Sequence, residues 1–277
     1  MYKLLNAGFT RLKKSNLFFA LVIFTIVLAC FVIYTQYSDM KNYNENIQID
    51  QLLLNYITII GIIIAIFTSL FLGREYSDGT LRNKIVVGSN RIKIYFSNLL
   101  IVMITSLLSQ VLYMLVIALI GIPIFGTLNM PLATFGIIFI DIIGIILSFS
   151  SIFVFIAMIV PNKTIISITS ILLAFGMMMI SITLLSRIEA TEYRDVAKIE
   201  NSETNQIEMV QEKNPRYLTE DKRKIYQTIL NFIPSGQAFM VAGRMDINFH
   251  ILPVYSLGVI IFFSGTGLYL FNRKELN

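Results

Sequence analysis

The sequence predicts an all-α polytopic membrane protein, and two observations support this fold class. Of the 277 residues, 56% are hydrophobic and only 14% are charged, whereas a soluble domain carries roughly 25% charged residues. The charges are also segregated, and runs of about 20 residues match the helix length that crosses the roughly 30 Å hydrocarbon core of a bilayer. We therefore expect membrane-spanning helices joined by polar loops.

The first element, residues 1–16, is predicted to be an amphipathic helix lying on the membrane surface. Its apolar and basic side chains alternate at helical spacing, with Tyr2, Leu5, Phe9 and Leu12 in one set and Lys3, Arg11, Lys13 and Lys14 in the other. A basic amphipathic helix of this kind is typical of an interfacial anchor that contacts lipid.

Six apolar segments are long enough to span the membrane, five of them within residues 17–186 and the last within residues 251–277. They are Leu17–Thr35, Leu52–Leu72, Leu99–Ile120, Leu132–Val160, Thr164–Ser186 and Ile251–Phe271. The fourth is long enough to tilt or to break within the membrane. The first contains the lipobox-like sequence Val27-Leu28-Ala29-Cys30, but its apolar run continues past the cysteine, as an uncleaved anchor should.

The distribution of Lys and Arg predicts the orientation of these spans. Residues 1–16 hold four, residues 73–97 hold five, Lys163 adds one and residues 251–277 add two, which makes twelve on one side. The short loops on the other side hold only Lys41. Because basic residues stay on the cytoplasmic side, we expect both termini in the cytoplasm and residues 187–250 outside.

The external segment 187–250 is too polar to span the membrane. We expect an unstructured spacer over residues 195–220.

Several functional classes lack their characteristic residues. Cys30 is the only cysteine and His250 the only histidine, so we expect no intrachain disulfide, no cysteine-based zinc site and none of the usual catalytic triads. No phosphate-binding loop of the G-x-x-x-x-G-K-[ST] type occurs. We therefore expect no bound nucleotide, metal or cofactor, and we attribute the net charge of +5 to membrane orientation rather than to nucleic acid.

The most polar stretch of the spanning region is GREYSDGTLRNKI, residues 73–85, within the loop 73–97 that joins the second and third spans. Acids (Glu75, Asp78) precede bases (Arg82, Lys84), an order that complements a helix dipole. Tyr76, Leu81 and Ile85 could form an apolar edge. Gly79-Thr80 allows close backbone approach. Two interpretations remain: a small helix that docks on a soluble partner, or a solvated loop that obeys the charge rule.

The sequence REYSDGTLRNKIVVGSNRIKIYFSNLL resembles the first cytoplasmic loop of type-2 ABC exporter permeases. The positions that match the pattern of this family are Glu75, Gly79, Thr80, Leu81, Arg82, Arg91 and Lys93. The resemblance implies a coupling helix that docks on an ATP-binding subunit. The implied docking residues are Glu75, Tyr76, Asp78, Gly79, Thr80, Leu81, Arg82 and Ile85.

Apolar patches over residues 226–233 and 238–241 resemble the short external helices that type-2 ABC exporter permeases place ahead of the last span. This resemblance implies that both patches are helical and dip into the outer leaflet.

The same resemblance implies the partners and the location of the chain. It implies two copies of a separate ATPase, which bind ATP and Mg²⁺, and a second permease chain, identical or a sister, that completes twelve spans in a bacterial cell membrane. The nearest similarity is to exporters of lantibiotics, bacitracin and phenol-soluble modulins, so we expect export of amphipathic or antimicrobial peptides. Small hydrophobic drugs, lipid-linked glycans, or a non-transporting peptide-sensing immunity role stay open. An intramembrane enzyme would need paired acidic or histidine residues, which Asp141 lacks.

Polar and adaptable side chains inside the spans are candidates for a translocation path. Asp141 is the clear charge within a span, and Thr134, Asp141 and Ser148 recur every seven residues on one helix face. We favour an interhelical hydrogen bond for Asp141 over a transport role. In the fifth span, Ser170 and Met178 offer a soft surface, although methionine more often serves packing.

Overall fold

The structure is a computed structural model that describes residues 1–44, 46–199, 207–243 and 251–274. Within these ranges, six helices are long and apolar enough to cross a membrane. Their main helices are α2 (Asn16–Tyr43), α4 (Ile57–Ser77), α6 (Arg91–Val116), α8 (Leu132–Ile159), α9 (Lys163–Ile188) and α12 (Leu252–Arg273). With the short helices that adjoin them, the second span extends over Ile49–Ser77 and the third over Arg91–Phe125. Each contains most of one predicted apolar segment, which confirms the all-α polytopic fold.

Two of the spans are longer than their apolar runs. Helix α2 continues past Thr35 to Tyr43, and helix α6 begins at Arg91 rather than at Leu99. Polar residues at a membrane surface can stay helical, because a helix satisfies its backbone groups internally. The fourth span does not break, since α8 is continuous.

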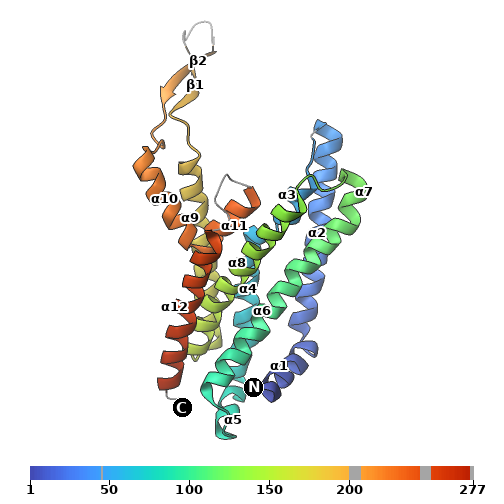
Figure 1. The fold of residues 1–277 in the computed structure, drawn as a ribbon, viewed down its shortest axis with the longest axis vertical. Helices are drawn as coiled ribbons and strands as arrows, with labels where there is room; N and C mark the ends of the chain where they lie inside the picture. Colours follow the sequence, from blue (N-terminus) through green and yellow to red (C-terminus); the bar gives the residue numbers. More distant parts are fainter. Residues whose placement is uncertain (45, 200–206, 244–250, 275–277) are drawn as a thin grey trace.

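Short helices adjoin two of the spans at the end of the bundle opposite the termini (Figure 1). Helix α3 (Ile49–Leu54) precedes α4. Helix α6 passes into a π-helical turn, η1 (Ile117–Gly121), and then into α7 (Ile122–Phe125). Pro123 explains this irregularity, because proline has no N–H and its ring displaces the carbonyl group one turn earlier.

Helices α4 and α8 form the centre of the bundle, with α2 and α6 on one side and α9 and α12 on the other (Figure 1). Close packing of α4 on α8 depends on Gly61, because a Cβ atom there would lie 2.6 Å from the Phe149 ring. Helix α2, by contrast, buries only Thr25, Ala29 and Ile33 within the chain.

The predicted amphipathic helix at the start of the chain is present as α1 (Tyr2–Lys13). Its Leu12 is buried, and Gly8 lies directly against the Ile101 side chain of α6. The Ser15 hydroxyl accepts a hydrogen bond from the backbone N–H of Leu17, at 3.2 Å, which begins α2. Helix α1 therefore packs under the bundle at the end where both termini lie, which we call the termini face (Figure 1).

The polar segment between α9 and α12 contains a β-hairpin, so the unstructured spacer predicted for residues 195–220 is wrong over 195–199 and 207–213. Residues 200–206 of that spacer lie outside the described residues. Strands β1 (Tyr193–Ile199) and β2 (Ile207–Lys213) pair antiparallel, from Tyr193 opposite Lys213 to Ile199 opposite Ile207. The hairpin projects from the end of the bundle that we call the hairpin face (Figure 1). These strands are hard to predict from composition because they carry many charged side chains. Pairing between the two strands stabilises them.

The two apolar patches that follow are helical, as predicted. They belong to α10 (Glu220–Phe232) and α11 (Pro234–Gly243). Helix α11 is buried along most of its length and packs among α4, α8 and α9. Gly236 makes the turn between the two helices possible, since a Cβ atom there would lie 2.3 Å from the Leu230 carbonyl oxygen.

The distribution of basic residues leads to a test of orientation. With Cys30 replaced by serine, an impermeant maleimide should label a cysteine at Gln211 in intact cells and should not label one at Asn83. Both positions are exposed, on β2 and α5 respectively. In inside-out vesicles the pattern should reverse, which controls for reactivity; labelling at Asn83 in intact cells would contradict the predicted topology.

Candidate functional site

The site is built around a tight turn at the termini face, where α4 ends and α5 (Thr80–Val86) begins. Gly79 has a φ of 65°, a left-handed conformation that glycine adopts without steric cost. Its N–H donates to the carbonyl oxygen of Tyr76 at 3.1 Å, and its own carbonyl accepts from Asn83 at 3.0 Å. A Cβ atom at Gly79 would meet nothing within 4 Å, so backbone conformation and not close approach explains this glycine.

This turn corrects one prediction about the polar stretch. Glu75 does not stand at the start of the short helix, because it lies in the last turn of α4. The first turn of α5 contains no acidic residue. The order of acids and bases therefore does not complement the dipole of α5, and the charge of Glu75 has another role.

Glu75 is the centre of an ion-pair cluster that joins four helices. Its side chain is only 2% exposed. Arg11 of α1 lies 2.5 Å from Oε1, and Lys84 of α5 lies 2.6 Å from the same oxygen. The other oxygen, Oε2, accepts a hydrogen bond from Nδ2 of Asn98 in α6 at 3.2 Å. Because charge-assisted hydrogen bonds are the strong ones, this carboxylate fastens α1, α5 and α6 to the end of α4.

The apolar edge of α5 is turned toward the same bundle. Leu81 is 1% exposed and belongs to the hydrophobic core, while Tyr76 and Ile85 are partly buried against it. The Thr80 hydroxyl donates to the carbonyl oxygen of Glu75 at 3.3 Å. Leu81 thus holds α5 to its own chain, and its side chain is not on the outer surface.

The outer side of the turn carries a different set of residues. Val86 is 76% exposed and Val87 is 84% exposed, which is unusual for adjacent apolar side chains in a polar loop. Four polar residues of the same stretch are also exposed: Arg74, Asp78, Arg82 and Asn83. We call these six residues the outer face of the loop.

A second cluster joins the loop to α8 and to the end of α12. The Tyr76 hydroxyl donates to the carbonyl oxygen of Met158 at 2.6 Å. Nζ of Lys274 donates to the Tyr76 hydroxyl at 3.0 Å and lies 4.6 Å from the centroid of its ring. Burial lowers the pKa of Lys274 to about 8, and the charge of Arg91 contributes to this shift.

Arg91, at the start of α6, joins the end of the loop to the end of α12. Its Nη1 donates to the carbonyl oxygens of Phe271 at 2.9 Å and of Asn272 at 3.1 Å, and also to that of Lys274. These carbonyls lack partners within α12 because they lie at its C-terminal end. Lys93, the other basic residue of the matched pattern, is exposed.

The four predicted path residues fall in two places inside the subunit. Asp141 and Ser148 lie on the face of α8 that packs against α12, where the Ser148 hydroxyl donates to the carbonyl oxygen of Ser256 at 3.2 Å. Ser170 is buried on α9 and Met178 is half-buried there. Asp141 is 1% exposed, and neither carboxylate oxygen has a hydrogen-bond partner among the described residues. The interhelical hydrogen bond that we favoured is therefore absent from the part of the chain that the structure describes.

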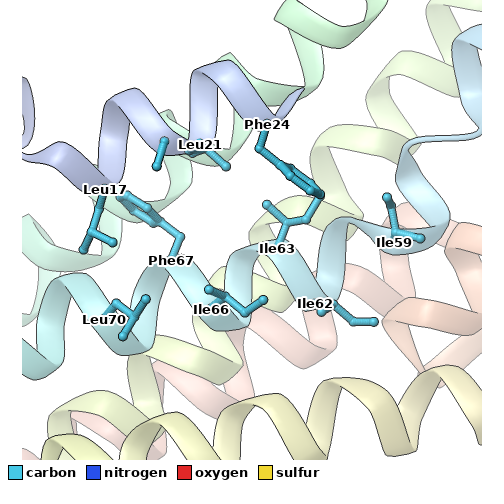
Figure 2. Close-up of a pocket in the computed structure, with 10 residues that line it drawn as sticks. Leu17, Leu21, Phe24, Ile59, Ile62, Ile63, Ile66, Phe67 and Leu70 are labelled. Atoms are coloured by element: carbon cyan, nitrogen blue, oxygen red, sulfur yellow. The ribbon is translucent and has the colours of Figure 1, made fainter. Parts of the chain in front are cut away.

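An apolar groove lies between α2 and α4, with a volume of about 500 Å³. Figure 2 shows its side chains, which come from Leu17 to Phe24 on α2 and from Ile59 to Leu70 on α4. A polar contact follows the groove residues of α2: the hydroxyls of Thr25 and Tyr56 are hydrogen-bonded at 3.2 Å.

Six helices that are long and apolar enough to cross a membrane define a multi-pass membrane protein, in which ion pairs hold a short helix at one end of the bundle. The family model described as ABC-2 family transporter protein matches residues 4–193, which is more than half of the chain. The chain therefore belongs to the ABC-2 family of transporters, as a membrane permease component. A comparison with the curated proteins finds no match.

The Glu75 cluster leads to a prediction about stability. Glu75→Gln should lower the free energy of unfolding of the permease by about 1–3 kcal/mol, because Arg11 and Lys84 lose the negative charge between them. Since both cations are partly exposed, the cost stays below that of a fully buried pair. Thermal unfolding in detergent measures this change. Asp78→Asn, an exposed acid three residues away, is the matched control; equal losses in both variants would contradict the role of Glu75.

Asp141 leads to the opposite prediction. Asp141→Leu should raise the free energy of unfolding by about 1–3 kcal/mol, because it removes a buried carboxylate without a partner. Ser148→Ala, which deletes a bonded hydroxyl about two turns away on the same helix face, should instead lower it. A destabilised Asp141→Leu protein would show that the carboxylate is satisfied in the folded state.

Proposed function

We propose that this chain is the membrane-spanning subunit of an ATP-driven exporter, that its preferred substrates are amphipathic or antimicrobial peptides, and that α5 is its dock for the ATP-binding subunit. One observation carries the docking proposal: α5 is held from within by Glu75 and Leu81 while its outer face stays uncovered. A helix that transmits the motion of a partner subunit must be fixed to its own chain and must also present a free contact surface.

The proposed dock is the outer face of the loop. Val86 and Val87 are apolar anchors of the kind that occupy the centre of an interface, and Arg82 and Asp78 supply the polar rim. Of the eight residues in the sequence-based docking set, Glu75 and Leu81 then act as supports. The partner would bind ATP and Mg²⁺ through its own residues.

The proposed assembly contains two ATPase subunits and two permease chains in a bacterial cell membrane, with the termini face in the cytoplasm. The exposure of α2 supports this composition, because α2 is the least buried of the six spans within the described residues. A second copy of this chain or a sister permease is the proposed partner there.

The substrate proposal rests on the loop resemblance and on the groove of Figure 2. An apolar groove suits the apolar face of an amphipathic peptide. Its volume also falls within the roughly 300–1,000 Å³ typical of small-molecule sites. Export of a small hydrophobic molecule is therefore the second candidate function.

The docking proposal is tested by placing charges on the outer face. Val86→Asp combined with Val87→Asp should reduce the co-purified ATPase at least about tenfold, because each charge would be desolvated in the complex. The permease itself should reach the membrane in normal amounts, since neither side chain packs on its own chain. Affinity purification from co-expressing cells measures the amounts of permease and co-purified ATPase. Peptide-stimulated ATP hydrolysis by the purified sample then measures coupling.

Two further variants make this test specific. Leu128→Asp, which alters an exposed leucine at the hairpin face, should leave ATPase binding unchanged. Leu81→Asp should instead lower the amount of folded permease, because Leu81 is buried within the chain. Normal ATPase binding by the variant with both valine substitutions would contradict the proposed docking surface.

A further inference from the structure

The groove between α2 and α4 extends over about half of the membrane thickness. Leu17 and Leu70 lie at the end nearer the termini face, and Phe24 and Ile59 lie at the other end (Figure 2). The rise along α4 from Ile59 to Leu70 is about 16 Å, which is close to half of the roughly 30 Å hydrocarbon core. Beyond this depth a hydrogen bond joins α2 to the start of α4. The groove therefore has the length of one lipid leaflet.

The lining of the groove is apolar throughout, and the groove opens sideways. Ile63 and Phe67 are buried and form its floor, while Phe24 is 50% exposed and Ile66 is 40% exposed at its edge. In a membrane this opening faces lipid. A hydrocarbon chain could enter there without leaving a polar group unpaired.

Three exposed basic residues adjoin the end of the groove at the termini face. Lys13 and Lys14 precede the turn into α2 and lie within four residues of Leu17. Arg74 follows Leu70 by four residues, so both side chains are on the same face of α4. Neither of the two ion pairs among the described residues involves any of these three basic side chains.

Acidic residues leave this positive charge uncompensated. No Asp or Glu precedes Asp39 in the sequence. On α4, Glu75 is buried and already paired with Arg11 and Lys84. Asp78 is exposed, but it lies one turn further out on the loop. The end of the groove at the membrane surface is therefore complementary to an anionic headgroup, which basic residues beside a membrane attract.

We propose that the groove binds an acyl chain of an anionic phospholipid from the leaflet at the termini face, and that Lys13 and Lys14 contact the phosphate of its headgroup. A spanning helix from a second copy of the chain fits less well, because it would need a groove through the whole hydrocarbon core. The inference requires only that the chain spans a membrane, and it does not depend on peptide export. A peptide that used the same groove would have to displace this lipid.

The test uses the full chain, reconstituted in vesicles of phosphatidylcholine. Because the chain contains no tryptophan, one introduced tryptophan reports on a single position. Phe24→Trp places this reporter in the groove. Phe175→Trp places it on α9, on the other side of the bundle, and is a matched control because both phenylalanines are 50% exposed.

Quenching of the reporter by brominated acyl chains measures which lipid is in contact with it. Equal fractions of brominated phosphatidylglycerol, which is anionic, and brominated phosphatidylcholine, which is zwitterionic, are compared. At position 24 phosphatidylglycerol should bind about fivefold more tightly, whereas at position 175 the two lipids should bind within about twofold of each other.

The lysines are then tested with a control of equal charge. Lys13→Gln combined with Lys14→Gln should reduce the preference at position 24 to within about twofold, and should leave the result at position 175 unchanged. Lys3→Gln combined with Lys93→Gln removes two exposed lysines that lie at the start of α1 and on α6, and should retain the preference. Arg74 stays in every variant, because it also belongs to the outer face of the loop.

Three results would overturn the proposal. The first is equal quenching by the two lipids at position 24, and the second is a preference that persists without Lys13 and Lys14. The third is a reporter at position 24 that neither lipid quenches while the one at position 175 is quenched, because another protein chain would then cover the groove. None of these measurements requires the ATPase, so they are independent of the proposed function.

Discussion

The burial of one carboxylate, that of Glu75, constrains the whole termini face. A buried carboxylate that loses its partners costs several kcal/mol, so the donors that surround it must stay in place. Those donors come from α1, α5 and α6, while Glu75 itself belongs to α4. Four helices are therefore positioned by one side chain, and α5 moves only if this cluster moves or breaks.

The loop that contains Glu75 holds further helices by the same means. Tyr76 reaches the end of α8, and Arg91 caps the carbonyls at the end of α12. A force applied to α5 thus reaches helices on both sides of the bundle without passing through the membrane core. Helices α2 and α4 are packed less closely, since the groove of Figure 2 lies between them.

Two buried acids in the chain have opposite surroundings. Glu75 has an ion pair or hydrogen bond to each of three neighbouring helices, whereas Asp141 has no hydrogen-bond partner among the described residues. The difference is consistent with their depth. Glu75 lies near the membrane surface, where the long side chains of Arg11 and Lys84 keep partial contact with water while they reach it. Asp141 lies within a span, where polar neighbours are few, and an unpaired acid there is a candidate for function.

The sequence by itself determined the six spans, the amphipathic start and the position of the polar loop. These features depend on local composition, because a bilayer imposes a minimum apolar length on every helix that crosses it. The match of the chain to the ABC-2 family agrees with the loop resemblance, which covers contiguous residues. Helix ends were less predictable, since α2 and α6 continue through polar residues that composition assigns to loops.

Only the tertiary structure decided which contacts the residues of the loop make. The partners of Glu75 include Lys84, nine positions away, and Asn98, 23 positions away, together with Arg11 from the start of the chain. No local pattern brings these side chains together, because helix packing sets their distances. The same packing turns Leu81 inward and leaves Val86 and Val87 outside.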